Sequence, residues 1–555
     1  MSNSITAAAP RRGSETDVAA GSTAAAPQEE FEMAEGGTSN EETEIEYPTG
    51  AKFYAMLTGV LITTVLVGLD FSVIATAIPT ITNHFHTTAD IGWYVAVYRL
   101  TGTAFLFLFG KLYTVTSVKR TFLCALVLFE LGSLLCTVAP TSPILVLGRA
   151  ICGLGSGGLL SGGFTILTQS VPLRKRALYG GLAGGVETVA AVSGPVIGGV
   201  LTSKLSFRWC FGINLPLGVF AFAVIAAFFN NPRHNEDTDL PLKQKLQKLD
   251  LWATAIFVPS ITCLLLALQW GGLRYSWSDW RIIVLFILFA GSLAAFAWLQ
   301  WKKGENATLP LRILKQRSIL SGAFFAGCCT ASFTVVEYYM AIYLQAVRGY
   351  TPIRSALFSL PMVISLCIAL VLAGAGTTLT GYYVPFMFIC TVLGSIGAGL
   401  LTTLPVNATL ASLICFQALL GFGVGLGVQG PQVAAQTVLS DKEVPIGISL
   451  VMFGHGIGPA IMSVAAQAIF QNRLELDLGK LGVVSGLNNT SSTGGVDNMG
   501  IADLRQHLGG QKLAEVLTAL DSAVTQTLYL PVVLTCLTLL GAMGMEWRSV
   551  KQKTS

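Results

Sequence analysis

Fourteen apolar segments constrain the fold of this chain more than any other feature. About 20 apolar residues are enough to cross a bilayer as an α-helix, which satisfies its own backbone hydrogen bonds there. Only 12% of the 555 residues are charged, about half the usual share in soluble domains. The sequence therefore predicts an all-α polytopic membrane protein. The segments lie near residues 54–76, 91–113, 120–140, 143–168, 177–201, 209–229, 251–270, 281–301, 319–344, 353–375, 383–403, 408–432, 446–470 and 527–546.

The distribution of Lys and Arg predicts the orientation of the chain. Basic residues such as those at 174–176 gather in the loops on the side of the two termini, so we expect both termini in the cytoplasm. The tail, residues 1–48, is rich in Ala, Ser, Thr, Gly and Glu and is predicted to be disordered. The glycosylation sequons at Asn407, Asn488 and Asn489 then fall outside, whereas Asn306 falls inside and should stay unmodified.

An internal repeat divides the apolar segments into two halves. Its landmarks recur at offsets of 264 to 268 positions, and they pair Arg149 with Gln417, Gly110 with Gly374, Gly194-Pro195 with Gly458-Pro459, and Asp70 with Glu337. We predict an N-terminal six-helix half at 49–230, loops with two extra helices at 231–318, and a C-terminal six-helix half at 319–546. A loop at 471–526 is expected outside, and 547–555 form a cytoplasmic tail.

Charged side chains inside apolar segments are costly, so they mark candidate functional sites. Asp70, Glu187 and Glu337 have carboxyl groups that can bind and release a proton. Arg149 stays charged and can control that exchange from nearby. These four residues are our candidates for proton coupling. Each could instead form a fixed ion pair or hydrogen bond between helices, and Glu130, in a more peripheral segment, is expected to be such a structural partner.

Other polar residues in the apolar segments are candidates for lining a substrate cavity. They are Arg99, Gln417, Gln429 and His455. His455 could titrate near neutral pH, although a lone His among glycines also suits a packing role. Glycine and proline in these segments predict close helix packing and local breaks. The hinge and packing candidates are Gly153, Gly155, Gly157, Gly194, Pro195, Gly198, Gly458 and Pro459.

Several motifs within residues 50–546 resemble those of the major facilitator superfamily. Residues 68–79 resemble the first-span motif of fourteen-span exporters, 147–157 the fourth-span motif, and 194–199 the antiporter motif of span five. The chain is most similar to fungal toxin and multidrug efflux carriers of the drug:proton antiporter group. The resemblance implies the major facilitator fold, in which two six-helix halves, here with two inserted central helices, rock about a central site.

One further motif resembles the gating loop between spans two and three of this superfamily. It consists of Gly110, Lys111, Lys119 and Arg120. The superfamily usually has an acidic residue where Thr114 stands, and that residue is associated with a charge contact between the halves. We therefore expect the gate to be held differently in this chain.

The expected function is that of a proton-coupled antiporter that exports a small amphipathic organic compound, in the plasma membrane or alternatively the vacuolar membrane. The alternatives are a proton symporter that imports an iron chelate or nutrient, and a non-transporting membrane sensor on the same scaffold. The expected partners are the substrate, protons and the bilayer, and the carrier is expected to be a monomer.

Other classes of function lack sequence support. No phosphate-binding G-x-x-x-x-G-K-[ST] loop and no basic patch interleaved with aromatics occurs, so neither a nucleotide nor a nucleic acid is an expected partner. The 11 cysteines contain no Cys-x-x-Cys spacing, so we expect no metal or other cofactor. The chain has no combination of residues typical of an enzyme.

Overall fold

The computed structural model describes residues 48–87, 90–229, 241–272, 274–405, 408–480 and 511–551. These residues are almost entirely helical, with one isolated β-bridge between Gly271 and Tyr275. They include fourteen helices that are long and apolar enough to cross a membrane, as predicted. The tail up to residue 47 and the sequons at Asn407, Asn488 and Asn489 lie outside the described residues.

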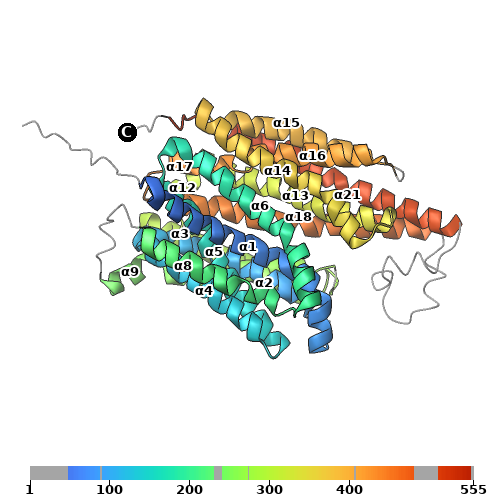
Figure 1. The fold of residues 1–555 in the computed structure, drawn as a ribbon, viewed down its shortest axis with the longest axis horizontal. Helices are drawn as coiled ribbons and strands as arrows, with labels where there is room; N and C mark the ends of the chain where they lie inside the picture. The colour runs from blue at the N-terminus through green and yellow to red at the C-terminus, as the bar shows by residue number, and fades with distance from the viewer. Residues whose placement is uncertain are drawn as a thin grey trace, which may run out of the picture. The chain divides into compact units, whose positions relative to one another are not determined.

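The first six spans form the N-terminal half (Figure 1). Two of the spans are built from two helices each, because α2 and α3 meet at Phe105 and α7 is followed directly by α8. The helices are α1 (Gly50–Phe85), α2 (Ile91–Ala104), α3 (Leu106–Val115), α4 (Val118–Val138), α5 (Ser142–Ser170), α6 (Leu173–Lys204), α7 (Trp209–Gly212) and α8 (Asn214–Phe228).

The next helices are those of the insertion between the halves. Two of them are long enough to cross a membrane. They are α10 (Leu251–Trp270) and α11 (Trp280–Lys303), flanked by the short α9 (Leu242–Lys248) and α12 (Leu311–Lys315).

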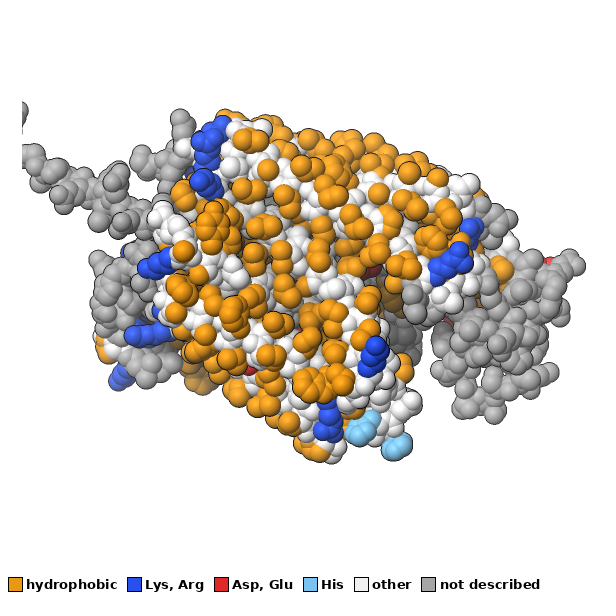
Figure 2. Space-filling model, in the orientation of Figure 1, with side chains coloured by type: hydrophobic (Ala, Val, Ile, Leu, Met, Phe, Trp, Pro, Cys, Tyr) orange, Lys and Arg blue, Asp and Glu red, His pale blue; other side chains and the backbone are white. Residues whose placement is uncertain are grey.

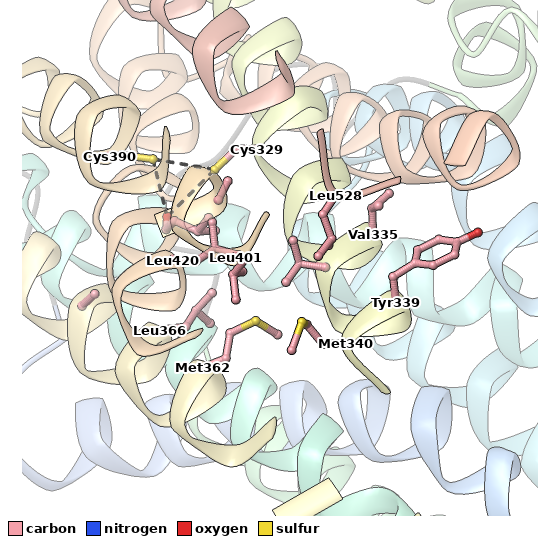
Figure 3. Packing of buried hydrophobic residues seen from close by; sticks show 14 of the residues in the cluster. Cys329, Val335, Tyr339, Met340, Met362, Leu366, Cys390, Leu401, Leu420 and Leu528 are labelled. Carbon is pink, nitrogen blue, oxygen red and sulfur yellow. Dashed lines mark hydrogen bonds between the residues drawn. The ribbon is translucent and has the colours of Figure 1, made fainter. Parts of the chain in front are cut away.

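The last six spans form the C-terminal half. Its helices are α13 (Arg317–Ile342), α14 (Pro352–Thr380), α15 (Val384–Leu401), α16 (Leu410–Gly427), α17 (Gly430–Val438), α18 (Val444–Lys480) and α21 (Gln511–Met543). Buried side chains of α13, α14, α15, α16 and α21 form its core. Figure 3 shows part of this core, with Met340 of α13 directed toward Met362 of α14, and with the Cys329 and Cys390 sulfur atoms 3.8 Å apart.

The two halves meet through a symmetric pair of contacts. Helix α6, the fifth span of the first half, packs on α14, the second span of the other half. In the same way α18, the fifth span of the C-terminal half, packs on α3, the end of the second span of the N-terminal half. The predicted repeat is therefore visible in the packing, and the fold is the predicted pair of six-helix halves with two additional helices.

Both cross-half contacts lie near one face, here called the terminal face because α1 begins and α21 ends there. A Cβ atom on Gly181 of α6 would lie 2.5 Å from the Leu370 carbonyl oxygen, and one on Gly374 of α14 would lie 2.5 Å from that of Ala177. Both positions therefore need glycine. Farther from the terminal face, Gly194 and Gly198 of α6 contact α1 of their own half instead. Figure 2 shows a notch in the surface between the halves on that side.

Two segments that were expected to be loops are partly helical: residues 471–526 and the gating-loop motif. Helices α18 and α21 reach to Lys480 and back to Gln511, so parts of the expected loop 471–526 are helical. Ser522 of α21 joins the two polar ends, because it accepts a hydrogen bond from Arg473 (3.3 Å) and donates one to Asp477 (3.0 Å), both on α18. Hydropathy missed them because only the apolar part of each helix carries the membrane signal.

The gating-loop motif also lies on helices. Gly110 and Lys111 belong to α3, and Lys119 and Arg120 to the first turn of α4. Only Thr116 and Ser117 lie between the two helices. The expectation that all four motif residues form a loop is therefore wrong, because helix α3 continues to Val115.

Candidate functional site

An ion pair between Asp70 of α1 and Arg149 of α5 lies in the interior of the N-terminal half. The Nη1 atom of Arg149 donates to Oδ2 of Asp70 over 2.5 Å, and the two side chains are 1% and 0% exposed. The Nε atom of Arg149 donates to the Tyr94 carbonyl oxygen (3.1 Å), and its guanidinium lies over the Tyr98 ring. Removing either charge would leave the other buried without its partner, at a cost of about 3–5 kcal/mol.

Asn214, at the start of α8, extends this pair into a network. Its Nδ2 atom lies 3.1 Å from Oδ1 of Asp70 and 3.2 Å from Oγ of Ser133 in α4, so it donates to both. Two atoms of the network have no hydrogen-bond partner among the described residues: Nη2 of Arg149 and Oδ1 of Asn214. Such orphaned groups are uncommon in a folded interior. In a different arrangement of the helices, these two atoms can form new hydrogen bonds.

Glycines on α5 bring its neighbours close enough to form this network. A Cβ atom on Gly157 would lie 2.5 Å from the Gly102 carbonyl oxygen of α2, and one on Gly155 would lie 2.5 Å from the Phe129 nitrogen of α4. Gly153 likewise faces Tyr98 of α2. Small residues at these positions allow backbone contact on two sides of α5. The packing expected of these three glycines agrees with this geometry.

A second charged cluster joins the two halves. Arg99 of α2 interacts electrostatically with Glu187 of α6 and with Glu337 of α13, and its guanidinium lies 3.8 Å from the centre of the Phe71 ring. Arg99 and Glu337 are exposed and Glu187 is partly exposed, although all three lie well inside membrane-spanning helices. Water and small solutes can therefore reach these charges, unlike the closed Asp70–Arg149 pair.

Glu187 also lines a small cavity of about 20 Å³ between α1, α5 and α6. Its wall is mostly apolar, with Thr63 and Thr64 as further polar residues. An apolar wall with a few polar groups is the character of a ligand pocket, but in this arrangement of the helices the space holds only about one water molecule. The close approach of α1 and α6 links the pocket to the ion pair, because a Cβ atom on Gly68 would lie 2.6 Å from the Glu187 carbonyl oxygen.

The other residues expected to line a cavity do not belong to the cluster around Arg99. Gln417 is fully buried in α16, and its Nε2 atom donates to the Leu413 carbonyl oxygen of its own helix (3.1 Å). The expectation that Gln417 lines a cavity is therefore wrong: it occupies the buried repeat position of Arg149. Gln429 is partly buried against Gly184 of α6, at the contact between the halves. His455 of α18 is partly buried and 3.0 Å from Gln432.

Polar contacts near the terminal face also connect the halves. Arg176, at the start of α6, forms an ion pair with Asp441, which precedes α18 (3.8 Å). Arg174 donates to the Thr378 carbonyl oxygen of α14 (3.3 Å), whereas Lys111 donates to that of Ala307 (2.9 Å), which lies in the insertion between the halves. A charge contact between the halves thus exists, although Thr114 replaces the usual acidic residue.

The Gly-Pro pairs lie on the contacts between the first and fifth spans of each half. A Cβ atom on Gly198 would lie 2.6 Å from the Val73 carbonyl oxygen of α1, and Gly458 approaches Gly327 of α13 closely. Pro195 and Pro459 each lie inside a continuous helix, α6 and α18. Packing is therefore the visible role of these residues, and bending about them stays a prediction.

Sequence reasoning missed Asn214, Ser133 and Asp441. Asn214 was detectable as an amide within an otherwise apolar span. Asp441 was detectable through the repeat. It follows Arg176 by 265 positions, within the range of the repeat offsets, and it has the opposite charge. Ser133 had no signal, because serine is a common small residue in membrane helices.

The described residues contain fourteen membrane-length helices, twelve of them in two related halves, with charged residues that water can reach between the halves. These features define a secondary transporter. Two solved structures share the fold at 12% sequence identity. They are the human organic anion transporter MFSD10 (TM-score 0.55, covering 88% of this chain and 100% of that one) and the proton:xylose symporter XylE (TM-score 0.54, covering 90% and 98%).

The sequence comparisons are more specific. The family model described as Major Facilitator Superfamily matches residues 60–463, and the chain belongs to this superfamily. It is 42% identical to the MFS-type efflux pump MFS1 of Arthroderma benhamiae, with 92% of this chain and 94% of that protein covered. It is 41% identical to the aspyridones efflux protein of Neocamarosporium betae (91% and 89% covered) and 40% identical to efflux pump aflT of Aspergillus parasiticus (91% and 97% covered). The resemblance to fungal efflux carriers is thus confirmed.

Proposed function

We propose that this transporter exports a small amphipathic organic compound, such as a secondary metabolite, a mycotoxin or a drug, in exchange for protons. The export direction is supported by relatives named as efflux pumps, which are about 40% identical over nine tenths of the chain. The proton coupling rests on a single observation: Asp70, a titratable group, lies buried and paired with Arg149 in the N-terminal half.

In the proposed mechanism, a proton that binds Asp70 neutralises the carboxylate and weakens its attraction for Arg149. The freed guanidinium must find other acceptors, so the helices that hold the network rearrange. Helix α1 contacts α6 at Gly68 and Glu187, and α6 contacts α14 of the other half. A change at Asp70 can therefore reach both the accessible charged cluster and the contact between the halves.

The substrate site in this proposal is the region around Arg99, Glu187 and Glu337, together with the pocket beside α1 and α6. Its charges and its apolar wall suit a molecule with a polar group on a mostly apolar body. Gln429 and His455 lie closer to the terminal face and would meet the substrate when that face opens. In this scheme Glu187 and Glu337 also exchange protons when substrate leaves.

For the orientation, we place both termini in the cytoplasm. The terminal face is then cytoplasmic, and the contacts between the halves there describe a carrier closed to the cytoplasm. We assign the carrier to the plasma membrane, with the vacuolar membrane as the alternative, and we expect the single chain to transport on its own. One proton moving down about 100 mV releases roughly 2.3 kcal/mol, enough for a substrate gradient of about fiftyfold.

The decisive test compares small molecules inside cells and in the medium, with the gene deleted or restored, and with or without a protonophore. Proton-coupled export predicts that one compound moves from the medium into the cells on deletion, and that the protonophore reproduces this change. A compound that is instead depleted inside the cells would identify an importer. No change in any compound would favour a non-transporting sensor.

A further inference from the structure

Glu130 of α4 is a partly buried acid that the proposed mechanism does not use. Both of its carboxyl oxygens are inaccessible, and neither has a hydrogen-bond partner among the described residues. The carboxyl group lies directly against Gly218 of α8, where even a Cβ atom would collide with it. This pocket for a carboxyl group therefore depends on glycine at position 218.

The carboxyl group lies one helical turn from the Asp70–Arg149 network. Ser133 follows Glu130 by three residues on α4, and Asn214 precedes Gly218 by four residues on α8. Asn214 donates both to Ser133 and to Asp70, so the two acids lie on either side of one polar unit. The orphaned Nη2 of Arg149 and Oδ1 of Asn214 belong to this same unit.

Solvation decides the charge of Glu130 in this arrangement. A buried carboxylate without a hydrogen bond or counter-ion costs several kcal/mol. Asp70 has the buried Arg149 guanidinium beside it, whereas Glu130 has no cation within bonding distance among the described residues. Glu130 therefore holds its proton here, while Arg149 is paired with Asp70.

We propose that Glu130 is a second proton-binding residue of the transporter, coupled to Asp70 through competition for Arg149. This inference rests on the proposed function, because it assumes that Asp70 gains and loses a proton during transport. When Asp70 gains a proton, Arg149 loses its partner and its positive charge needs a carboxylate. Glu130 supplies one by giving its own proton to Asp70, so that the O–H bond on Glu130 breaks as the one on Asp70 forms.

The surroundings of Glu130 leave few other groups to balance its charge. Helix α5 faces this part of α4 with Arg149 and Cys152. Helix α7 also packs on α4, but its Cys210 bonds to Thr202 and to the Gly198 carbonyl oxygen of α6. Helix α8 has no titratable residue from Asn214 to Phe228. Helix α3 meets only the first turns of α4. Its titratable side chains bond elsewhere: Tyr113 donates to the Gly158 carbonyl oxygen, and Lys111 donates to that of Ala307. Arg149 is thus the one cation on the facing helices that can serve both acids.

The test uses the purified full-length chain and needs no substrate. Infrared difference spectroscopy across a pH titration detects the C=O stretch of protonated carboxyl groups. We expect a pH-dependent band that Glu130→Gln removes. Asp70→Asn should shift the pH midpoint of that band by about 1 pH unit or more, as coupled groups do. Glu475→Gln, on the exposed end of α18, is the matched control and should leave the band unchanged.

Two outcomes would overturn the inference. One is a Glu130→Gln spectrum identical to that of the unchanged protein at every pH. The other is a Glu130 band that neither titrates nor responds to Asp70→Asn, which would make Glu130 a fixed structural acid. If Glu130→Gln does not fold, Glu130→Asp keeps the acid and should shift the band. Because no transport is measured, a failure of the export proposal would be seen separately, in the cell experiment.

Discussion

Asp70 and Arg149 are 79 residues apart in the sequence, yet their charged atoms lie 2.5 Å apart in the interior of the N-terminal half. The contact excludes water, because the two side chains are 0% and 1% exposed. Each charge is stabilised by the other, with Asn214 as a further donor to Asp70 and the Tyr94 carbonyl oxygen as a further acceptor for Arg149. The proposed coupling depends on the loss of this ion pair when Asp70 binds a proton.

The first prediction separates the role of this pair in coupling from its role in stability. Asp70→Asn and Arg149→Ala should each abolish proton-driven export, and each should destabilise the fold by up to about 3–5 kcal/mol by leaving one buried charge. The double variant Asp70→Asn/Arg149→Met should recover most of this stability but no transport. Thermal unfolding in detergent and export from cells measure the two effects. Full export by either single variant at normal protein level would disprove the coupling.

The second prediction concerns two glycines one turn apart on α6. Gly181→Ala should weaken closure at the terminal face, because the new Cβ atom would meet the Leu370 carbonyl oxygen at 2.5 Å. Overpacking of this kind costs about 1–3 kcal/mol, which shifts a two-state equilibrium by about 5- to 150-fold. The native Cys367, whose sulfur donates to the Gly185 carbonyl oxygen, reports the change through its alkylation rate.

Gly185→Ala is the matched control for this experiment. It adds the same methyl group on the same helix, but its nearest neighbour would lie 3.8 Å away, an ordinary contact. We expect its alkylation rate to stay within about twofold of that of the unchanged protein. Equal effects of the two substitutions would show that helix propensity, and not the contact with α14, controls closure.

The fold was predictable because local hydropathy indicates the helices and a repeat within the sequence indicates the two halves. Fourteen apolar segments gave the helices, and the pairing of Gly194-Pro195 with Gly458-Pro459 gave the two halves. The limits of α18 and α21 were not predictable from hydropathy, because their polar ends stabilise each other through hydrogen bonds of Ser522 with Arg473 and Asp477.

The candidate site was predictable only in part. Asp70 and Arg149 were recognised because a charged side chain in an apolar segment is costly to bury and therefore marks a candidate functional site. Gln417 does not line a cavity, because repeat equivalence predicts a place in the fold and not access to a cavity. Asn214 and Asp441 act through partners far away in the sequence, so no local pattern reveals what they contact.

The third prediction tests the ion pair between Arg176 and Asp441. Asp441→Arg should place two positive charges together and favour opening of the terminal face. The double exchange Arg176→Asp/Asp441→Arg restores opposite charges and should recover at least half of the lost transport. Export and Cys367 alkylation both measure this. If the double exchange were no better than the single one, another contact would hold the gate.

A fourth prediction concerns topology. We expect a glycosidase to reduce the apparent mass of the protein, and this shift to shrink when Asn488 and Asn489 are replaced by Gln. Asn306→Gln should change nothing, because its loop faces the cytoplasm in our orientation. A shift that depends on Asn306 would instead reverse the assignment of both termini.

The fifth prediction tests the accessible cluster as a substrate site. Arg99 balances Glu187 and Glu337, and it contacts Phe71. Arg99→Gln removes the positive charge and leaves two acids in the cavity, so export of acidic compounds should fall relative to neutral ones. A lost interaction of about 1.4 kcal/mol corresponds to a tenfold change in this ratio. Competition between acidic and neutral compounds in export from cells measures it.

Arg354→Gln is the control that separates this effect from the loss of any exposed arginine. Arg354 is also exposed and also lies over an aromatic ring, that of Tyr350 at 4.7 Å, but it sits in the first turn of α14 away from the charged cluster. We expect its substitution to change the ratio by less than about twofold. A large effect of both substitutions would point to a surface potential that steers substrates. An effect of Arg99→Gln alone places the substrate beside Arg99.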